Sequence, residues 1–472
     1  MRGMLRELAA IATKEKTPLY IVGGFVRDGL LGRESRDVDL AVGYEAGQFA
    51  KRISWLLRGD YELLESQAQY SRVTLTGSDG RPFYLDFSLL RGESIAEDLK
   101  CRDFTVNAMA VSLDDYLLGP GWPEKVIDPC GGKNDLSARL LRVVGEESLR
   151  HDPVRLFRSA RFMHKLGFEL AADTAGMLRK NAPLIRQANK IKLCLELFQL
   201  LSQEYAAEGL RVLQEDIGVL GALYEPLAEM SETETGGEDL FSHGLQVCRC
   251  LDEILGGASG MDPTLRRKLA AHLHAETGEN RSRITYLRLA CVLHDIGKLG
   301  LSKGRIALSA KSFSHELAAE AYLTGLARLL RFCDEEFFYL SRLIGNHSRP
   351  LLMVDGEDCM TAKLRYFRQF ADLAPDLILL AMANIAAREG CRADGVRQLE
   401  SVLAEFFAGF FLELPEPILH AKELMEFFNL PPTRTVGMLL ERLYAEQMAG
   451  TIKTKKSALS YVSGLLAKRE KV

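Results

Sequence analysis

The chain has 472 residues, of which 47% are hydrophobic and 26% are charged, and its formal net charge is −4. This ordinary globular composition extends over too many residues for one hydrophobic core, so we expect three or four domains. The slightly acidic balance excludes a generally basic nucleic-acid-binding protein, and such a partner would need a local basic surface. Nine cysteines occur without any C-x-x-C pair, which is typical of a reducing, cytoplasmic compartment.

The first residues, 1–16, mix charged and apolar side chains, which predicts an amphipathic helix rather than a signal peptide. No later apolar run is expected to reach the length of a membrane span, so we expect no membrane contact.

Leu19–Val22 reads as a strand, and Phe25–Leu31 as a short helix after a pair of glycines. At Gly24 the backbone N–H groups can approach a phosphate closely, and Arg27 lies one turn into the helix, where it could reach a phosphate oxygen.

A second predicted strand carries two carboxylates, Asp37 and Asp39. Side chains at i and i+2 of a strand point the same way, so both carboxylates share one face while Val38 and Leu40 occupy the other. Paired carboxylates suit Mg²⁺, which takes oxygen ligands and shares them with substrate phosphates. The alternative for a single D-x-D is a solvated strand end or turn, but its combination with the glycine pair favours a metal–nucleotide site.

The run G-G-F-V-R-D-G-L-L-G-R-E-S-R-D-V-D-L-A resembles the first motif of the class II tRNA nucleotidyltransferase and bacterial poly(A) polymerase family. This resemblance implies an α+β chain, in which a polymerase-β-like palm sheet with helices is followed by an all-α neck, an HD-like region and a tail. The domains expected from it are a catalytic head at 1–149, a helical nucleotide- and RNA-binding neck at 150–235, an HD-like domain at 236–400 and a helical tail at 401–472.

Within the head, a helix is expected over Tyr44–Arg58 and strands over Arg72–Leu75 and Pro82–Leu90. Asp86 alternates with apolar neighbours in the last of these strands. It is either a third carboxylate facing the same metals or an aspartate on an edge strand, and the sequence leaves both interpretations open.

The run from Glu97 to Ala110 resembles the second family motif, with Cys101 in place of the first of its two usual arginines. The resemblance implies that Arg102, Asp103 and Asn107 hold the nucleotide and its ribose. Asp103 could instead cap a helix over Phe104–Val111, and both interpretations are compatible. A third motif-like run, Asp128–Leu136, resembles the family's hinge between head and neck.

The segment Leu90–Ser94 is much shorter than the flexible loop of relatives that add a complete CCA end.

In the neck, Asp152 and Pro153 read as the N-cap and first residue of a helix. From there Asp152, Arg155, Arg158 and Arg161 recur every third residue. The family uses such a stripe as a protein template, in which Asp152 and Arg155 would read the base and the other arginines would hold the triphosphate. His151 replaces the usual Glu, which leaves base choice open, and a solvated surface helix is the alternative. We interpret the basic residues that follow as an RNA-binding surface: Lys165, Arg179, Lys180, Arg186, Lys190 and Lys192.

After a polar linker at Ser231–Asp239, His243 and the doublet His294–Asp295 resemble an HD phosphohydrolase-type domain. His315 and His347 occupy places where such domains often have further histidines. Asn384 stands where a closing aspartate ligand is expected, so we favour an HD-like fold kept for RNA support over one that binds a second divalent metal.

The sequence therefore predicts a nucleotidyltransferase that adds C to the tRNA 3′ end from CTP, and in a CCA-adding version also from ATP, by two-metal phosphoryl transfer with Mg²⁺. The short loop favours CC addition. A poly(A) polymerase and an HD-domain phosphohydrolase are the two alternatives. The tail is expected to be helical from Glu416, and its basic end is either an RNA contact or a solvated terminus.

Overall fold

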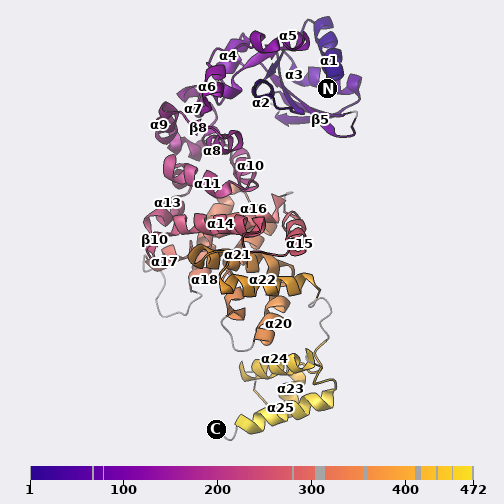
Figure 1. The fold of residues 1–472 in the computed structure, drawn as a ribbon, viewed down its shortest axis with the longest axis vertical. Helices are drawn as coiled ribbons and strands as arrows, with labels where there is room; N and C mark the ends of the chain where they lie inside the picture. Colours follow the sequence, from indigo (N-terminus) through magenta and orange to yellow (C-terminus); the bar gives the residue numbers. More distant parts are fainter. Residues whose placement is uncertain are drawn as a thin grey trace. The chain divides into compact units, whose positions relative to one another are not determined.

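The computed structural model describes residues 2–65, 69–77, 79–278, 281–302, 314–354, 359–409, 416–431, 434–448 and 450–469 (Figure 1). The chain forms two compact units, one of residues 1–196 and 212–223, the other of residues 197–211 and 224–472. The first unit contains a mixed sheet followed by helices, and the described part of the second is mainly helical, as the α+β prediction requires. The finer division into four domains stays a prediction.

The sheet of the first unit has six strands in the order β3-β4-β5-β2-β1-β6. The central strands β2 and β5 run parallel, with Asp39 opposite Asp86, and every other neighbouring pair is antiparallel. Asp86 therefore lies on an interior strand, and its interpretation as an edge-strand aspartate is wrong. The strand bounds are β1 Leu19–Val22, β2 Asp37–Val42, β3 Asp60–Glu65, β4 Tyr70–Thr76, β5 Pro82–Leu89 and β6 Ala110–Ser112.

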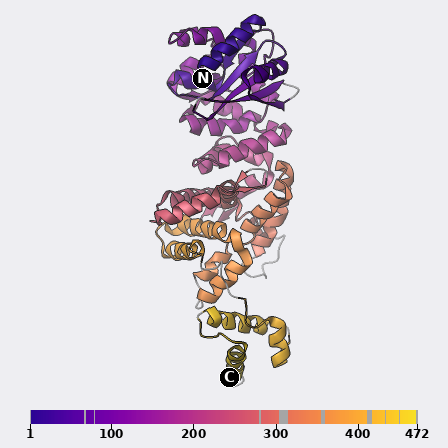
Figure 2. The same ribbon diagram turned by 90° about the vertical axis from the view of Figure 1, so that its right-hand side faces the viewer.

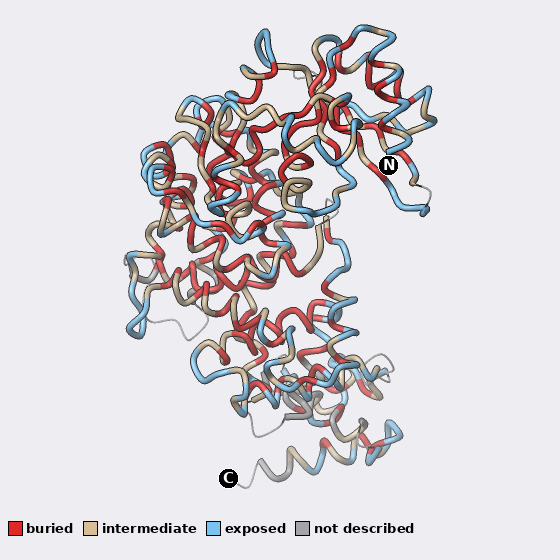
Figure 3. Tube along the Cα trace, turned by 45° about the horizontal axis from the view of Figure 1, so that its top comes forward, coloured by how far each residue is buried: buried red, intermediate tan, exposed pale blue. Residues whose placement is uncertain are grey.

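The two faces of this sheet differ in polarity, as the alternation along β2 predicts. Val38 and Leu40 are fully buried, and beside them Phe87 of β5 packs edge-to-face on Phe49 of α3 (Ala46–Leu57), with ring centroids 5.9 Å apart. The opposite face carries Asp37, which is exposed, and Asp39, which is partly buried. Apolar burial thus fixes the strand register, and the register fixes where the carboxylates point. Figure 2 draws the strands of this unit as arrows, and Figure 3 colours the buried segments of the chain red.

Short helices cover the ends of the sheet and continue through the first unit. The predicted amphipathic helix is α1 (Arg2–Lys14), which buries one apolar stripe. The remaining helical elements are α2 Gly24–Leu30, α4 Ile95–Lys100, a 3₁₀ turn Thr105–Asn107, α5 Leu113–Leu117, a 3₁₀ turn Trp122–Lys125, α6 Gly132–Ala138, α7 Glu146–His151, α8 Arg155–Leu166, α9 Ala172–Asn181, a 3₁₀ helix Ala182–Gln187, α10 Lys190–Leu201, a π-helix Val212–Asp216 and α12 Val219–Leu223, with β7 Leu140–Leu141 paired to β8 Glu169–Leu170.

Two helix boundaries differ from the prediction. The expected helix over Phe104–Val111 is a 3₁₀ turn followed by β6, because the Ala110 N–H and C=O pair with Ile127 and close the sheet edge. Helix α8 begins at Arg155, two residues later than Pro153, and Asp152 ends the preceding helix α7. The Asp152 carboxylate still accepts a hydrogen bond from the Val154 N–H at 3.2 Å, so its side chain stabilises this turn.

The second unit buries α14 (Leu240–Gly256) against α16 (Arg283–Leu293) and α21 (Ala374–Glu389). The expected polar linker at Ser231–Asp239 starts inside a helix, which ends at Glu232, and continues as a tight hairpin, because Gly236 and Gly237 adopt positive φ and let β9 pair with β10. The other elements are α11 Ala206–Arg211, α13 Glu225–Glu232, β9 Glu234–Thr235, β10 Glu238–Asp239, α15 Pro263–Leu273, β11 Glu276–Thr277, β12 Arg281–Ser282, α17 Lys298–Ser302, α18 Ser314–Leu330, α19 Asp334–Ile344, 3₁₀ helices Arg349–Met353 and Ala371–Leu373, α20 Cys359–Phe370, α22 Asp394–Phe407, α23 Ala421–Phe428, α24 Arg434–Met448 and α25 Lys455–Arg469.

One stretch of this unit, Tyr366–Glu389, has the length and composition of a membrane-crossing helix, contrary to the expectation from sequence. It has this composition because it is a core segment, since 72% of its most apolar window is buried inside the structure. The helical tail is confirmed over the described residues, where α23, α24 and α25 share a small core that includes Leu424, Leu443 and Val462.

Candidate functional site

The two predicted carboxylates and Asp86 lie together on one face of the sheet. Asp39 is two residues from Asp37 on β2 and pairs in register with Asp86 on β5. Gly23 turns the chain between β1 and α2 with φ of +68°, and a Cβ at this position would lie 3.1 Å from Asp39 Oδ2 and 3.4 Å from an Arg102 guanidinium nitrogen. Glycine is therefore needed both for the backbone conformation and for space, and the turn directs the Gly24 N–H to donate to Asp39.

The surroundings of the Asp39 carboxylate disfavour its negative charge when no cation is bound. Its removal from water raises its pKa to about 6; the Arg102 guanidinium opposes this shift, and the carboxylates of Asp86 and Asp37 add to it. A divalent cation between Asp37 and Asp39 would relieve this crowding of negative charge, and oxygen donors are the ligands that such cations prefer. The residues present thus fit the divalent metal that the sequence predicts.

Asp86 differs from the other two because its charge is already compensated. Arg72 donates to both of its oxygens at 2.7 Å, and Tyr70 donates its hydroxyl to Oδ2 at 2.9 Å. Asp86 is almost fully buried. Sequence reasoning missed Arg72 and Tyr70 as its partners, although their alternation on β4 places both on the face of Asp86. The structure shows that the charge of Asp86 raises the pKa of Asp39, and its role as a third carboxylate facing the metals stays a prediction.

We expect the raised pKa of Asp39 to make the metal-free protein less stable as pH rises from about 4 to about 6. The folded state holds the Asp39 proton more tightly than the unfolded state, so stability is full below the unfolded pKa of 3.8 and is lost as pH rises through about 6. The loss is at most about 3 kcal/mol, from about 1.4 kcal/mol per pKa unit. Chemical unfolding in a chelating buffer at several pH values, compared with Asp39→Asn, measures it, and identical pH profiles for the two proteins would contradict it.

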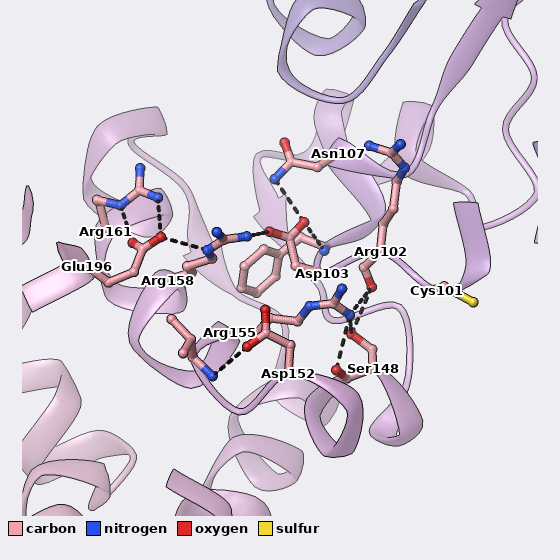
Figure 4. Close-up of polar contacts among 12 residues, drawn as sticks. Cys101, Arg102, Asp103, Asn107, Ser148, Asp152, Arg155, Arg158, Arg161 and Glu196 are labelled. Atoms are coloured by element: carbon pink, nitrogen blue, oxygen red, sulfur yellow. Dashed lines mark hydrogen bonds and ion pairs between the residues drawn. The ribbon is translucent and has the colours of Figure 1, made fainter. Parts of the chain in front are cut away.

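Buried polar contacts connect the first and second motifs of the head. Arg27 is buried and donates to Asn107 Oδ1 at 2.5 Å and to Asp28 at 2.8 Å. Asn107 donates in turn to Asp103 Oδ1 at 3.2 Å (Figure 4). The Phe104 N–H also donates to Asp103, which is the local capping bond that the sequence analysis considered, although the structure forms it at a 3₁₀ turn rather than a long helix.

These contacts continue into the arginine stripe of α8. Arg158 donates to Asp103 Oδ2 at 3.4 Å and to Glu196 Oε1 at 2.7 Å, and Arg161 also binds Glu196, at 2.9 Å (Figure 4). Burial alone would raise the pKa of Asp103, but the guanidinium groups of Arg158 and Arg155 lower it below its ordinary value. Glu196, a buried residue of α10, had no distinctive sequence signal.

Arg155 is the most enclosed arginine of the stripe. One of its terminal nitrogens donates to the Arg102 carbonyl at 3.0 Å and to the Ser148 hydroxyl at 2.6 Å, and its Nε has no hydrogen-bond partner among the residues the structure describes. The alternative of a surface helix with solvated arginines is therefore wrong for Arg155. Arg102, whose carbonyl this bond holds, directs its side chain to the buried Asp98 at 2.9 Å, an i,i+4 partner that sequence reasoning did not use.

The basic side chains after α8 are largely engaged within the first unit. Lys180 binds Glu146 at 3.0 Å, Lys192 binds Glu65 at 2.9 Å, and Arg186 donates to the Ala222 carbonyl at 2.7 Å. Arg179 donates to the Asp216 carbonyl. Their interpretation as an RNA-binding surface stays a prediction, and these contacts show that part of their hydrogen-bonding capacity is already used.

In the second unit, the structure brings His243, His294 and Asp295 together, with one ligand atom of each within 4.8 Å of the others. Asn384 Oδ1 lies 3.2 Å from His243 Nε2, where the missing aspartate was expected, and the Lys298 ammonium pairs with Asp295 at 2.6 Å. A neutral amide and a competing ammonium make this set a poor fit for a metal, and the interpretation as a degenerate HD-like fold stays a prediction. His347 packs edge-to-face against His294, with ring centroids 5.1 Å apart, and the side chain of His315 lies outside the described residues.

Paired carboxylates on a central strand, beside a glycine turn that opens a helix and a cluster of arginines, define a nucleotidyl-transferring palm. Residues 19–142 match the family described as the poly A polymerase head domain. The chain is 26% identical to a CC-adding tRNA nucleotidyltransferase of Geobacter sulfurreducens over 97% of this chain and 94% of that protein. It is 29% identical to an A-adding tRNA nucleotidyltransferase of Deinococcus radiodurans over 94% of each.

Solved structures agree on the fold. A Thermotoga maritima CCA-adding enzyme complexed with tRNA matches 98% of this chain and 95% of its own with a TM-score of 0.59 and 19% identity, and a CCA-adding enzyme with ATP matches the same shares with a TM-score of 0.65 and 18% identity. The head thus matches the poly A polymerase head domain family, and the chain over nearly its full length is similar to tRNA nucleotidyltransferases. It is therefore an enzyme of the nucleotidyltransferase type, in a family that depends on divalent cations.

Proposed function

We propose that this protein adds nucleotides to the 3′ end of tRNA without a nucleic-acid template, and that its products are the two C residues made from CTP. The observation that carries the proposal is the placement of Asp37 and Asp39 beside the turn at Gly23 and the guanidinium of Arg102, in a chain whose relatives named for tRNA nucleotide addition align over nearly its full length. The free cysteines among the described residues support a reducing, cytoplasmic setting.

The residues of the head have separable tasks in this proposal. Asp37 and Asp39 would hold Mg²⁺, which when bound supplies positive charge to the triphosphate and to the attacking 3′ oxygen. The Gly24 N–H holds Asp39 in place, and the side chains of Arg27 and Arg102 would orient the phosphate oxygens. By the resemblance, Asp103 and Asn107 would hold the ribose side of the nucleotide, and their own hydrogen bonds keep the turn that carries them in place.

The arginine stripe extends this pocket. Arg158 and Arg161 present guanidinium groups that share one buried carboxylate, Glu196, so an incoming triphosphate would compete with that carboxylate for them. Full displacement would leave Glu196 as an unpaired buried carboxylate, which is costly. The triphosphate would therefore share the two guanidinium groups with Glu196, through the N–H groups that Glu196 leaves free. Asp152 and Arg155 together offer an acceptor and donors for the Watson–Crick edge of a base.

Asp152→Ala is expected to relax base selection. A bidentate contact discriminates between bases by about 1–3 kcal/mol, so the ratio of CTP to ATP incorporation should fall by roughly 10- to 100-fold. Single-nucleotide incorporation with each triphosphate measures the ratio. Asp60→Ala, which makes the same change at an exposed aspartate of the same unit, is the matched control. An unchanged ratio in Asp152→Ala would show that Asp152 does not take part in base recognition.

The segment Leu90–Ser94 supports CC rather than CCA addition. It joins β5 to α4 in five residues and is tied down, since the Arg91 N–H donates to Asp98 and the Glu93 N–H donates to Glu97 at 2.7 Å. Ser94 then caps α4 by accepting from the Glu97 N–H. So short a connection cannot supply the longer loop that the resemblance associates with adding the terminal A.

The decisive experiment offers the full chain two tRNA substrates, one lacking the CCA end and one ending in CC, with CTP, ATP or both. Sequenced products ending in CC from the first substrate, with no extension of the second, are the expected result. Extension only of the tRNA that ends in CC would instead make the protein an A-adding enzyme, like the relative from Deinococcus radiodurans. Long A tracts on unrelated RNA would replace the proposal with a poly(A) polymerase.

A further inference from the structure

A second group of metal-ligand side chains lies in the helical unit, apart from the histidine set. Cys250 and Glu253 are three residues apart on α14, so both project from one side of the helix. Cys391 comes from the segment after α21 and donates its thiol to Glu253 Oε2 at 3.2 Å, across 138 residues of sequence. The two sulfurs and the carboxylate oxygen all lie within 4.8 Å of one another.

The fold positions this group. Helices α14 and α21 pack side by side, and α21 ends at Glu389 because Gly390 adopts φ of +91°. This left-handed residue turns the chain back, which brings Cys391 over the last turns of α14. Cys250 is buried, Cys391 is partly exposed and Glu253 is exposed, so the group has one fixed ligand and opens toward solvent.

We propose that Cys250, Glu253 and Cys391 form a binding site for a thiolate-preferring divalent cation of the zinc type, with a solvent molecule or an exogenous ligand in the fourth position. Thiolate sulfurs are soft ligands, so two thiolates with one carboxylate bind zinc in preference to magnesium. Magnesium is the ion proposed for the head. Zinc–sulfur bonds of about 2.3 Å place tetrahedral sulfurs roughly 3.8 Å apart. Small rotations of Cys391 and Glu253 would therefore complete the geometry.

Without a metal the group is a pair of protonated thiols. Burial and the Glu253 hydrogen bond raise the pKa of Cys391 to about 12, and burial also raises the pKa of Cys250. Binding would displace these protons, so affinity should rise with pH. Such thiols also resist air oxidation compared with thiolates, because the thiolate is the reactive form.

The test uses the full chain, prepared with a phosphine reductant and freed of metal, and titrated with Co²⁺ as the probe. Thiolate-to-cobalt charge transfer gives near-ultraviolet absorption that histidine and carboxylate ligands do not produce, so it separates this group from His243, His294 and Asp295. The expected result is that this absorption saturates at one thiolate-bound Co²⁺ per chain, whatever further Co²⁺ the head carboxylates take up, and that it is lost when Zn²⁺ displaces the cobalt.

Cys391→Ser is the decisive variant, because a partly exposed side chain can change without disrupting the core, and it should abolish the absorption. Glu253→Gln should weaken binding by at least about tenfold. Cys333→Ser is the matched control: Cys333 caps α19 through its side chain, a role that serine fills, and it lies outside the group. His294→Ala should also leave the absorption intact. Absence of the band in the wild type, its persistence in Cys391→Ser, or an intact mass showing a Cys250–Cys391 disulfide under reducing conditions would overturn the proposal.

Discussion

Asp39→Asn is expected to lower nucleotide incorporation by at least about a thousandfold while leaving the protein folded. The substitution removes one anionic ligand but keeps an oxygen that can accept the Gly24 N–H, so the turn is preserved. Loss of several kcal/mol of metal-assisted stabilisation corresponds to this factor at about 1.4 kcal/mol per tenfold. Steady-state incorporation of CTP into tRNA that lacks its 3′ end, at saturating divalent cation, measures the change.

The same substitution should not destabilise the metal-free protein, since it removes a carboxylate whose pKa is raised by burial. Asp60→Asn is the matched control, because it makes the same chemical change at an exposed position of β3, an edge strand of the same sheet. Asp37→Ala should behave like Asp39→Asn. Near-normal turnover in either catalytic variant, with the fold intact by circular dichroism, would show that the paired carboxylates do not take part in catalysis.

Asp103→Ala is expected to cost the first unit about 3 kcal/mol of stability and to reduce nucleotide binding. Removing one member of a buried ion pair leaves its partner uncompensated, which typically costs about 3–5 kcal/mol. We expect the lower end of this energy range because Arg158 keeps its contact with Glu196. The loss also frees Asn107, the residue that holds Arg27 at the turn.

Denaturant unfolding of the first unit, followed with and without CTP, measures both the loss of stability and the loss of nucleotide binding. The pKa of Asp103 lies below 3.8 in the folded state, so its contribution is present at neutral pH and is lost as pH falls through that lowered value. Asp60→Ala, an exposed aspartate of the same unit, is the control. A stability change no larger than that of the control would mean that the contacts from Arg27 to Arg161 do not act as a connected unit.

The parts of the site that could be predicted from sequence are those in which local chemistry decides the outcome. Alternation along β2 assigned Asp37 and Asp39 to one face because a strand has a period of two, and the burial of Val38 and Leu40 confirms the register. The amphipathic pattern of α1 and the glycine turn before α2 were readable for the same reason, since each depends on neighbours in sequence.

The errors arose where long-range pairing overrode local preference. Phe104–Val111 has the signals of a capped helix, yet its second half forms β6 because hydrogen bonds to β1 and Ile127 satisfy its backbone. The polar Ser231–Asp239 segment looked like a linker, but two glycines with positive φ allow a hairpin.

By itself the sequence determined the motifs, the pairing of carboxylates on one strand and the family. Only the tertiary structure decided which charges are compensated: Arg72 neutralises Asp86, Arg102 partly offsets the charge of Asp39, and Glu196 holds Arg158 and Arg161. The physical reason is that a carboxylate's behaviour depends on the charges and the water within a few ångströms, and those neighbours come from distant parts of the chain.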